Sequence, residues 1–120
     1  MTRILLVDDD ETFRTVLRSV LTLHGHAVVE ARDGVDGLAK AREARFDAVI
    51  VDIVMPERDG LETIVSLRKN HPALKIIAIS GGGQLSGETY LAVAARLGAS
   101  AVLAKPFAVE AMLKAIPGTS

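Results

Sequence analysis

The chain contains no cysteine, which excludes both a disulfide framework and a thiolate metal site. It also lacks an excess of one charge: 14 basic residues stand against 15 acidic ones, so binding to nucleic acid through phosphate contacts has no support. No segment approaches the ~20 apolar residues of a membrane span, and the first apolar run, Ile4–Val7, is too short for a signal peptide. We therefore expect a cytoplasmic protein without a nucleic-acid or membrane partner.

Internal repeats, low-complexity tracts and linkers are absent as well. Apolar residues make up 49% of the chain and charged residues 24%, which is typical of a globular protein. A chain of 120 residues is long enough to bury roughly 65% of its unfolded surface. We expect a single domain over residues 1–120, with a polar tail at 117–120.

Short apolar segments alternate with segments of helical periodicity five times along the chain. The strands are predicted over Ile4–Val7, Ala27–Val29, Ala48–Val51, Ile76–Ile79 and Ala101–Leu103. The helices are predicted over Phe13–Leu21 with Gly25 closing, from an Asp33 cap to about Ala44, from Gly60 to near Asn70, from a Ser86 cap to Leu97, and over Ala108–Ala115. Such alternation predicts a doubly wound α/β fold, with five parallel strands in the order 2-1-3-4-5.

Polar side chains follow four of the five strands. Asp8 and Asp9 follow the first strand, Asp52 the third, Ser80 the fourth and Lys105 the fifth. Because the carboxyl ends of parallel strands meet at one edge of the sheet, these five side chains are expected to lie together.

Three carboxylates so placed repel one another unless a cation intervenes, and Mg²⁺ suits a shallow site with oxygen ligands. With a metal bound, one carboxylate is left to attack phosphorus and form an acyl phosphate. Lys105 and the Ser80 hydroxyl can each neutralise or hydrogen-bond a phosphoryl oxygen, and Gly81 leaves room for that group. The Lys105-Pro106 bond is a candidate cis peptide that would aim the lysine inward.

The chain resembles the receiver domain of two-component response regulators, a flavodoxin-like, CheY-like fold. The resemblance rests on Val7-Asp8-Asp9, the run from Asp52 to Pro56 followed by Asp59-Gly60, Ser80-Gly81 and Lys105-Pro106-Phe107, each in the expected place. It implies that Asp52 accepts a phosphoryl group from the phosphohistidine of a sensor histidine kinase or a histidine phosphotransfer protein. It further implies that Asp8, Asp9, Asp52 and the backbone carbonyl of Val54 hold Mg²⁺.

The same resemblance implies a phosphorylation-dependent protein contact, through the fourth and fifth helices and the fifth strand. We expect no turnover of a separate substrate, only catalysis of the domain's own phosphorylation and dephosphorylation. Two alternatives stay open: a relay intermediate that hands the phosphoryl group to another histidine, and a receiver module of a larger regulator or hybrid kinase.

The sequence departs from the family at three points. Val102 stands three residues before the lysine, where the family usually has a Tyr or Phe that acts as a rotameric switch. The loop Gly81–Leu85 is longer and richer in glycine than usual. Val54 and Gly82 are apolar at positions that commonly tune hydrolysis of the acyl phosphate.

Other classes of function fit the sequence less well. A phosphatase with an aspartyl nucleophile would need a second aspartate where Val54 stands, and a flavin-binding module would need a phosphate-cradling loop where Asp8 and Asp9 stand. A receiver that only binds partners would not need the intact set of acids, hydroxyl and lysine.

Several residues have a purely structural interpretation. Asp10 is predicted to cap the first helix, and Arg14 and Arg18 to form a solvated face, with donor docking by that helix as the alternative. The three histidines, His24, His26 and His71, are assigned to the surface. On the last helix, an apolar stripe of Val109, Leu113 and Ile116 favours a partner surface over simple burial.

Overall fold

The computed structural model describes residues 2–53, 60–81 and 87–117, and over these residues it has the predicted alternation of strands and helices. The strands are β1 (Arg3–Val7), β2 (Ala27–Ala31), β3 (Ala48–Asp52), β4 (Lys75–Gly81) and β5 (Ala101–Lys105). The helices are α1 (Glu11–Leu23), α2 (Gly34–Glu43), α3 (Gly60–Asn70), α4 (Gly87–Leu97) and α5 (Val109–Ala115). No helix in these ranges is long and apolar enough to cross a lipid bilayer.

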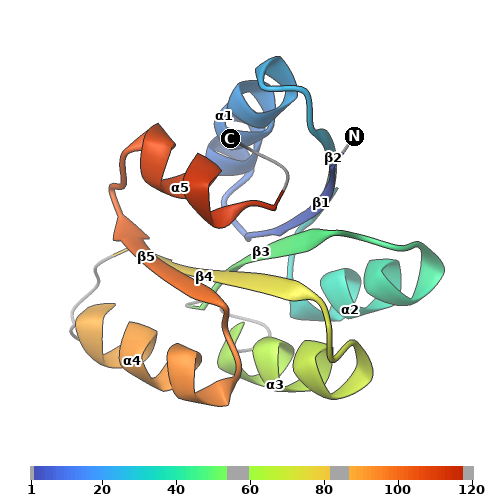
Figure 1. Cartoon of the computed structure of the whole chain (residues 1–120), viewed down its shortest axis with the longest axis vertical. Coiled ribbons are helices and arrows are strands. Elements are labelled where there is room, and N and C mark those ends of the chain that lie inside the picture. Colours follow the sequence, from blue (N-terminus) through green and yellow to red (C-terminus); the bar gives the residue numbers. More distant parts are fainter. Residues whose placement is uncertain (1, 54–59, 82–86, 118–120) are drawn as a thin grey trace.

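The strands form one parallel sheet in the order β2-β1-β3-β4-β5, as predicted. Helices α1 and α5 cover one face, and α2, α3 and α4 cover the other (Figure 1). The order places β1 and β3 side by side at the centre, and β2 and β5 at the two edges.

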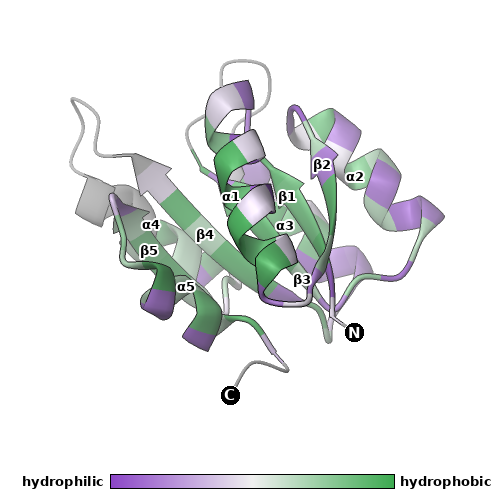
Figure 2. Ribbon diagram, turned by 90° about the horizontal axis from the view of Figure 1, so that it is seen from above, coloured by the Kyte–Doolittle hydropathy of each residue, from purple (hydrophilic) through white to green (hydrophobic). Residues whose placement is uncertain are grey.

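Side chains that alternate along the strands feed two separate core layers, because successive residues of a strand point to opposite faces. Leu5, Val49 and Val51 pack with α2, α3 and α4, whereas Ile4, Leu6 and Ile50 pack with α1 and α5. Figure 2 shows the same division, with hydrophobic strands at the centre and hydrophilic residues on the outer sides of several helices. The central strands are therefore buried on both faces.

Several helix ends have the capping residues that were expected from the sequence. The Asp10 carboxylate accepts from the Phe13 N–H, and the Asp33 carboxylate accepts from the Asp36 N–H, so both N-caps are confirmed. Gly25 and Gly98 end α1 and α4 with φ of 88° and 119°, a conformation that favours glycine. The predicted Ser86 cap lies outside the described residues.

Two surface assignments were wrong. Ile116 is only 2% exposed and Leu113 packs against the layer beneath α1 and α5, so most of the last helix's second stripe is core and only Val109 of that stripe is exposed. A seven-residue helix packed on a sheet buries more than one stripe of its surface, so simple burial explains this stripe better than a partner surface does. His26 is 6% exposed and also buried, since the turn after α1 folds it inward.

Candidate functional site

The carboxyl ends of β1, β3, β4 and β5 bring the five predicted site residues to one edge of the sheet. One carboxylate oxygen from each of Asp8, Asp9 and Asp52 lies within 4.8 Å of the other two. Asp8 and Asp52 are buried and Asp9 is exposed. The acids thus form a cluster that is closed on the protein side and open to solvent at Asp9.

Lys105 connects the two buried acids. Its Nζ lies 3.0 Å from Asp8 Oδ2 and 3.2 Å from Asp52 Oδ2, within hydrogen-bond distance of both. The lysine ends β5 and precedes a cis peptide bond to Pro106, as the sequence suggested. One ammonium group therefore bridges the ends of two neighbouring central strands from the edge strand.

The electrostatics of the cluster follow from burial. Burial, reinforced by the negative charge of Asp52, raises the pKa of Asp8 to about 6, although the Asp10 N–H and Lys105 both oppose the rise. Burial alone would lower the pKa of Lys105, but the charges of Asp52 and Asp8 outweigh it and raise that pKa. The site stabilises the lysine's charge more completely than that of Asp8.

This donor set fits a divalent cation with oxygen ligands. The three carboxylate oxygens lie close enough together to share one ion. The raised pKa of the buried Asp8 indicates that the negative charge of the cluster is only partly neutralised. Mg²⁺ accepts such ligands and keeps several waters, which the exposed side of Asp9 allows. The Val54 carbonyl, the other predicted ligand, lies outside the described residues.

Ser80 lies on the same edge, one residue before the end of β4. It is buried, and its Oγ has no hydrogen-bond partner among the described residues. A buried hydroxyl without a partner is costly, so its presence at this edge points to an acceptor that arrives with a ligand.

Two supporting side chains on α1 escaped the sequence analysis. Arg14 is not a solvated residue: its side chain is 13% exposed, its Nη1 donates to the Asp8 carbonyl oxygen at 2.6 Å, and its Nε donates to Glu30 at 3.0 Å. Phe13 places its ring 3.8 Å from Lys105 Nζ. A helical residue that faces back toward the preceding strand end gives little sequence signal beyond its spacing from the acids.

Glu30 holds both arginines of that helix. Burial would raise its pKa, but hydrogen bonds from Arg18 and Arg14 outweigh burial and lower it. Arg18 is more than half exposed and contacts Glu30 at 3.0 Å, so the predicted solvated face describes Arg18 alone. Glu30 thereby anchors Arg14 behind Asp8.

The predicted departures from the family are only partly described. Val102 lies in β5, paired in register with Ala78, and packs against the core layer beneath α2, α3 and α4. A half-buried valine has no ring to move between buried and exposed positions, as expected from the sequence. Positions 54–59 and 82–86, with most of the glycine-rich loop, lie outside the described residues.

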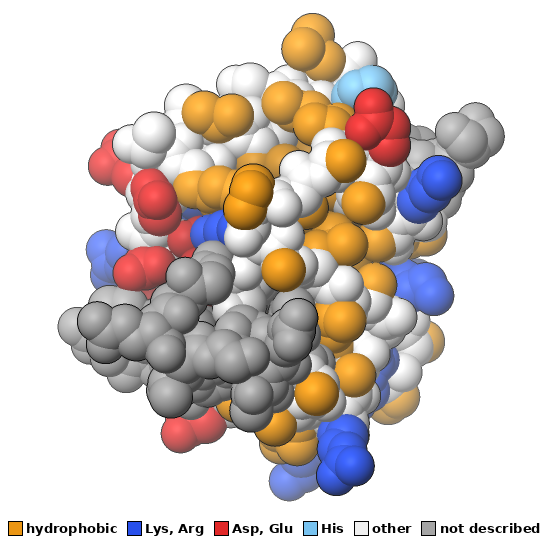
Figure 3. Space-filling model, turned by 90° about the vertical axis from the view of Figure 1, so that its left-hand side faces the viewer, with side chains coloured by type: hydrophobic (Ala, Val, Ile, Leu, Met, Phe, Trp, Pro, Cys, Tyr) orange, Lys and Arg blue, Asp and Glu red, His pale blue; other side chains and the backbone are white. Residues whose placement is uncertain are grey.

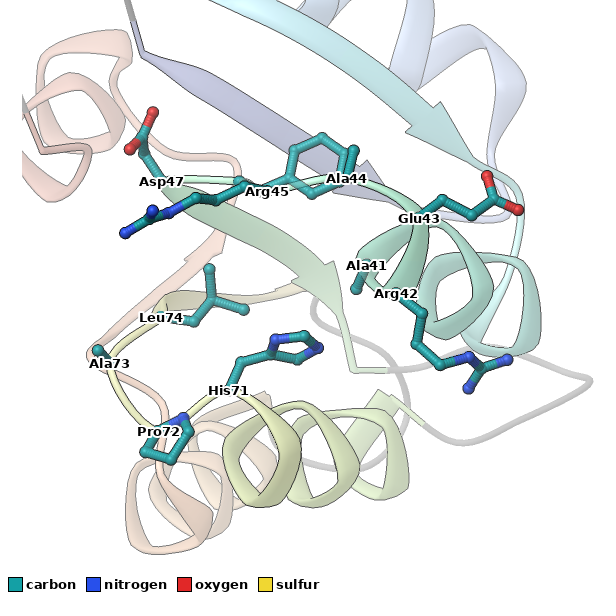
Figure 4. Close-up of a pocket in the computed structure, with 11 residues that line it drawn as sticks. Ala41, Arg42, Glu43, Ala44, Arg45, Asp47, His71, Pro72, Ala73 and Leu74 are labelled. Atoms are coloured by element: carbon teal, nitrogen blue, oxygen red, sulfur yellow. The ribbon is translucent and has the colours of Figure 1, made fainter.

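A cavity of about 640 Å³ lies at the opposite end of the sheet, away from the acids. Figure 4 shows it between the segment that leads into β3 and the turn after α3, with His71 and Leu74 on one side and Ala41 on the other. The strands β3 and β4 begin here and end at the acidic edge. The cavity therefore belongs to a different part of the molecule from the candidate site.

Similarity to known proteins extends over nearly the whole chain. Residues 4–117 match the model of the response regulator receiver domain. The response regulator MprA of Mycobacterium leprae (strain TN) is 40% identical over 114 residues, which are 95% of this chain and 49% of that protein. The chain thus spans about half the length of the curated relatives it matches.

Solved structures agree in fold and extent. The response regulator TrrA of Thermotoga maritima, solved in complex with Mg²⁺-BeF, has a TM-score of 0.84, is 30% identical, and covers 95% of each chain. A response regulator of Burkholderia pseudomallei, solved with a phosphorylated aspartic acid, a calcium ion and citrate, has a TM-score of 0.86 and is 29% identical, over 98% of this chain and 68% of that one. From its sequence, its sheet and its relatives alike, the chain belongs to the response regulator receiver domain family of two-component signalling.

Proposed function

We propose that this domain is a phosphorylation-dependent switch in which Asp52 accepts the phosphoryl group, with Mg²⁺ held by Asp8, Asp9 and Asp52. The observation that carries the proposal is the bridge from Lys105 to Asp8 and Asp52, at the same edge of the sheet as a Ser80 hydroxyl that has no partner among the described residues. A carboxylate, a cation and a hydroxyl donor at one edge are the groups that phosphoryl transfer needs. The phosphorylated aspartic acid and the Mg²⁺ of the two structural relatives support the same assignment.

In the proposed reaction, an Asp52 carboxylate oxygen attacks the phosphorus of a phosphohistidine. The new O–P bond forms as the N–P bond breaks, and the histidine nitrogen keeps the electron pair and takes up a proton. Lys105 and Ser80 each bind a phosphoryl oxygen, and Gly81 beside them adds no side chain. Bound Mg²⁺ supplies charge neutralisation for the transferring group.

The donor in this proposal is a sensor histidine kinase or a histidine phosphotransfer protein. A cytoplasmic location is part of it, because such donors draw their phosphoryl group from ATP. The domain would catalyse its own phosphorylation and dephosphorylation and no turnover of another substrate.

The output we propose is a change of protein partner at the surface of α4, β5 and α5. Strand β5 is an edge strand, Val93 of α4 and Val109 of α5 are exposed, and Figure 3 shows hydrophobic side chains gathered on this side of the molecule. Within a longer protein the partner could be an attached output segment.

The decisive experiment supplies Mg²⁺ and acetyl phosphate and follows the intact mass. The wild-type chain should gain one phosphoryl group, and Asp52→Asn should gain none while keeping its fold by circular dichroism. Back-transfer to a purified histidine phosphotransfer domain would identify a relay intermediate. An unmodified wild type, or an equally modified Asp52→Asn, would refute the proposal.

A further inference from the structure

The ammonium group of Lys105 is held on three sides, and one of these sides is an aromatic ring. Its Nζ lies 3.8 Å from the centre of the Phe13 ring, in addition to its contacts with Asp8 and Asp52. We propose that Phe13 is a positioning residue, which fixes the Lys105 ammonium at the acidic edge through a cation–π contact. This inference rests on the proposed phosphoryl transfer to Asp52.

The geometry is that of a strong contact of this kind. An ammonium within about 6 Å of a ring centre is attracted by the negative face of the ring, and the attraction grows as water is removed. The Lys105 side chain is only 18% exposed, so little water competes with the ring. The attraction energy of this cation–π contact should therefore lie nearer the larger value found for desolvated pairs.

The ring is itself held from behind. Phe107 packs against Phe13 in an edge-to-face arrangement, with ring centres 6.2 Å apart and planes at 84°. Phe107 follows the Lys105-Pro106 pair, while Phe13 lies in the first turn of α1, where its N–H donates to the Asp10 cap. The chain has only four aromatic residues, and two of them meet at this lysine.

A lysine needs such support more than most side chains. Its flexible four-carbon stem carries roughly 2 kcal/mol of rotamer entropy, and its ammonium is a point charge without fixed direction. The ring closes one side and the two carboxylates close the other two, so the ammonium is restricted to the edge where the phosphoryl oxygens would lie. Preorganised charge of this kind contributes to phosphoryl transfer without reorganisation during the reaction.

The chain offers an internal control. Arg3 lies over the Phe46 ring at 5.2 Å, a second contact of the same type. Phe46 lines the cavity at the opposite end of the sheet, so changes of its ring electronics do not reach Lys105.

The test replaces Phe13 by phenylalanines of increasing fluorination, which withdraw the negative charge from the ring face with little change in size. The rate of phosphorylation by acetyl phosphate should fall stepwise along the series, by about 2- to 30-fold in total. Phe13→Leu should reach the same low rate, and Phe13→Tyr should restore the wild-type rate. The same fluorinated series at Phe46 should leave the rate unchanged.

A second readout follows the contact itself. The Lys105 Cε protons should resonate upfield in the wild type, because the adjoining Nζ lies 3.8 Å from the ring centre, and should move downfield as fluorination weakens the contact. If the wild type is phosphorylated but the rate stays flat or rises along the fluorinated Phe13 series, the role of Phe13 is refuted and the proposed function is not. A wild type that gains no phosphoryl group refutes the proposed function, and the role of Phe13 falls with it.

Discussion

Arg14 supports the acidic edge without belonging to it. It donates to the Asp8 carbonyl at 2.6 Å while Glu30 holds its other side, so the backbone at Asp8 is fixed by a partly buried charge pair. Groups that orient a metal ligand affect metal binding even though they do not touch the ion.

We expect Arg14→Ala to weaken Mg²⁺ binding by on the order of tenfold, because Asp8 loses its fixed position. Isothermal titration of the purified domain with Mg²⁺ measures the effect. Arg18→Ala is the matched control, since it removes the exposed partner of Glu30 and leaves the contact to Asp8 intact. An Arg14→Ala protein with unchanged affinity would show that Asp8 needs no such support.

His26 carries a different prediction, on stability. Its two ring nitrogens are buried without a hydrogen-bond partner among the described residues, so the neutral form is favoured. Burial first, and then the charges of His24 and the N-terminus, lower its pKa.

Because the pKa of His26 is lower in the folded state, the unfolded chain binds the proton more tightly. Stability from this residue should be complete above the ordinary pKa of about 6.5 and should decline as the pH falls through the lower folded value. Guanidinium unfolding followed by circular dichroism between about pH 7.5 and 5 tests this. His26→Phe should flatten the decline and His71→Gln should keep it; equal slopes in all three proteins would contradict it.

For single residues, the sequence predicted which side chains lie at the acidic edge of the sheet, but not which side chains support them. Strand ends of a parallel sheet meet by topology, so Asp8, Asp52 and Lys105 could be placed together from order alone. Arg14 and His26 were misassigned because their burial depends on how α1 and the following turn lie on the sheet. That packing is a tertiary property with no local signature.

At the level of secondary-structure elements, α3 begins at Gly60, which lies directly against the end of β3. A Cβ added there would overlap the backbone oxygen of Asp52 and the Cα of Ile53. The first residue of α3 thus touches the end of the strand that carries the phosphoacceptor.

We expect Gly60→Ala to destabilise the fold by about 3 kcal/mol, because neither backbone can yield, and to slow phosphorylation of Asp52. Gly37→Ala is the milder comparison: the nearest atoms to its Cβ would belong to the Val7 side chain, at 2.8 Å, whereas at Gly60 they belong to the backbone and lie closer. Urea unfolding followed by circular dichroism ranks the two variants. A Gly60→Ala protein as stable as Gly37→Ala would mean that α3 shifts without cost.

Element order and strand pairing were predictable because hydrophobic periodicity marks the elements and glycine or aspartate residues mark several helix ends, as at Asp10, Asp33 and Gly25. The strands proved longer than predicted, by up to two residues at a polar end, as in β5, which runs on to Lys105. Polar side chains in those extensions interrupt the apolar pattern that marks a strand. Three of them, Asp52, Ser80 and Lys105, belong to the candidate site, so at these positions function rather than folding explains the residue type.

The stability of the whole molecule depends on strands whose side chains pack into both core layers. Ile50 of β3 is fully buried and lies in register with Leu6 and Ile77 in the two neighbouring strands. We expect Ile50→Ala to lower the free energy of unfolding by about 2–5 kcal/mol. Val16→Ala, at a position 58% exposed, should change it by less than about 0.5 kcal/mol.

Because the chain has no tryptophan, circular dichroism at several wavelengths replaces fluorescence as the probe of this unfolding. A single cooperative transition is expected for a domain of this size. Separate transitions for the two layers would contradict the view that β3 joins them.

The bridge formed by Lys105 also determines the charge of the acidic edge as a whole. With all four groups ionised, three carboxylates and one ammonium leave a net charge of −2. One divalent cation cancels that charge, whereas a monovalent cation leaves half of it. An anionic phosphodonor is repelled by the metal-free site with its charge of −2, and it meets a neutral surface once a divalent cation has bound. We therefore expect an obligatory order in which the cation binds before the donor.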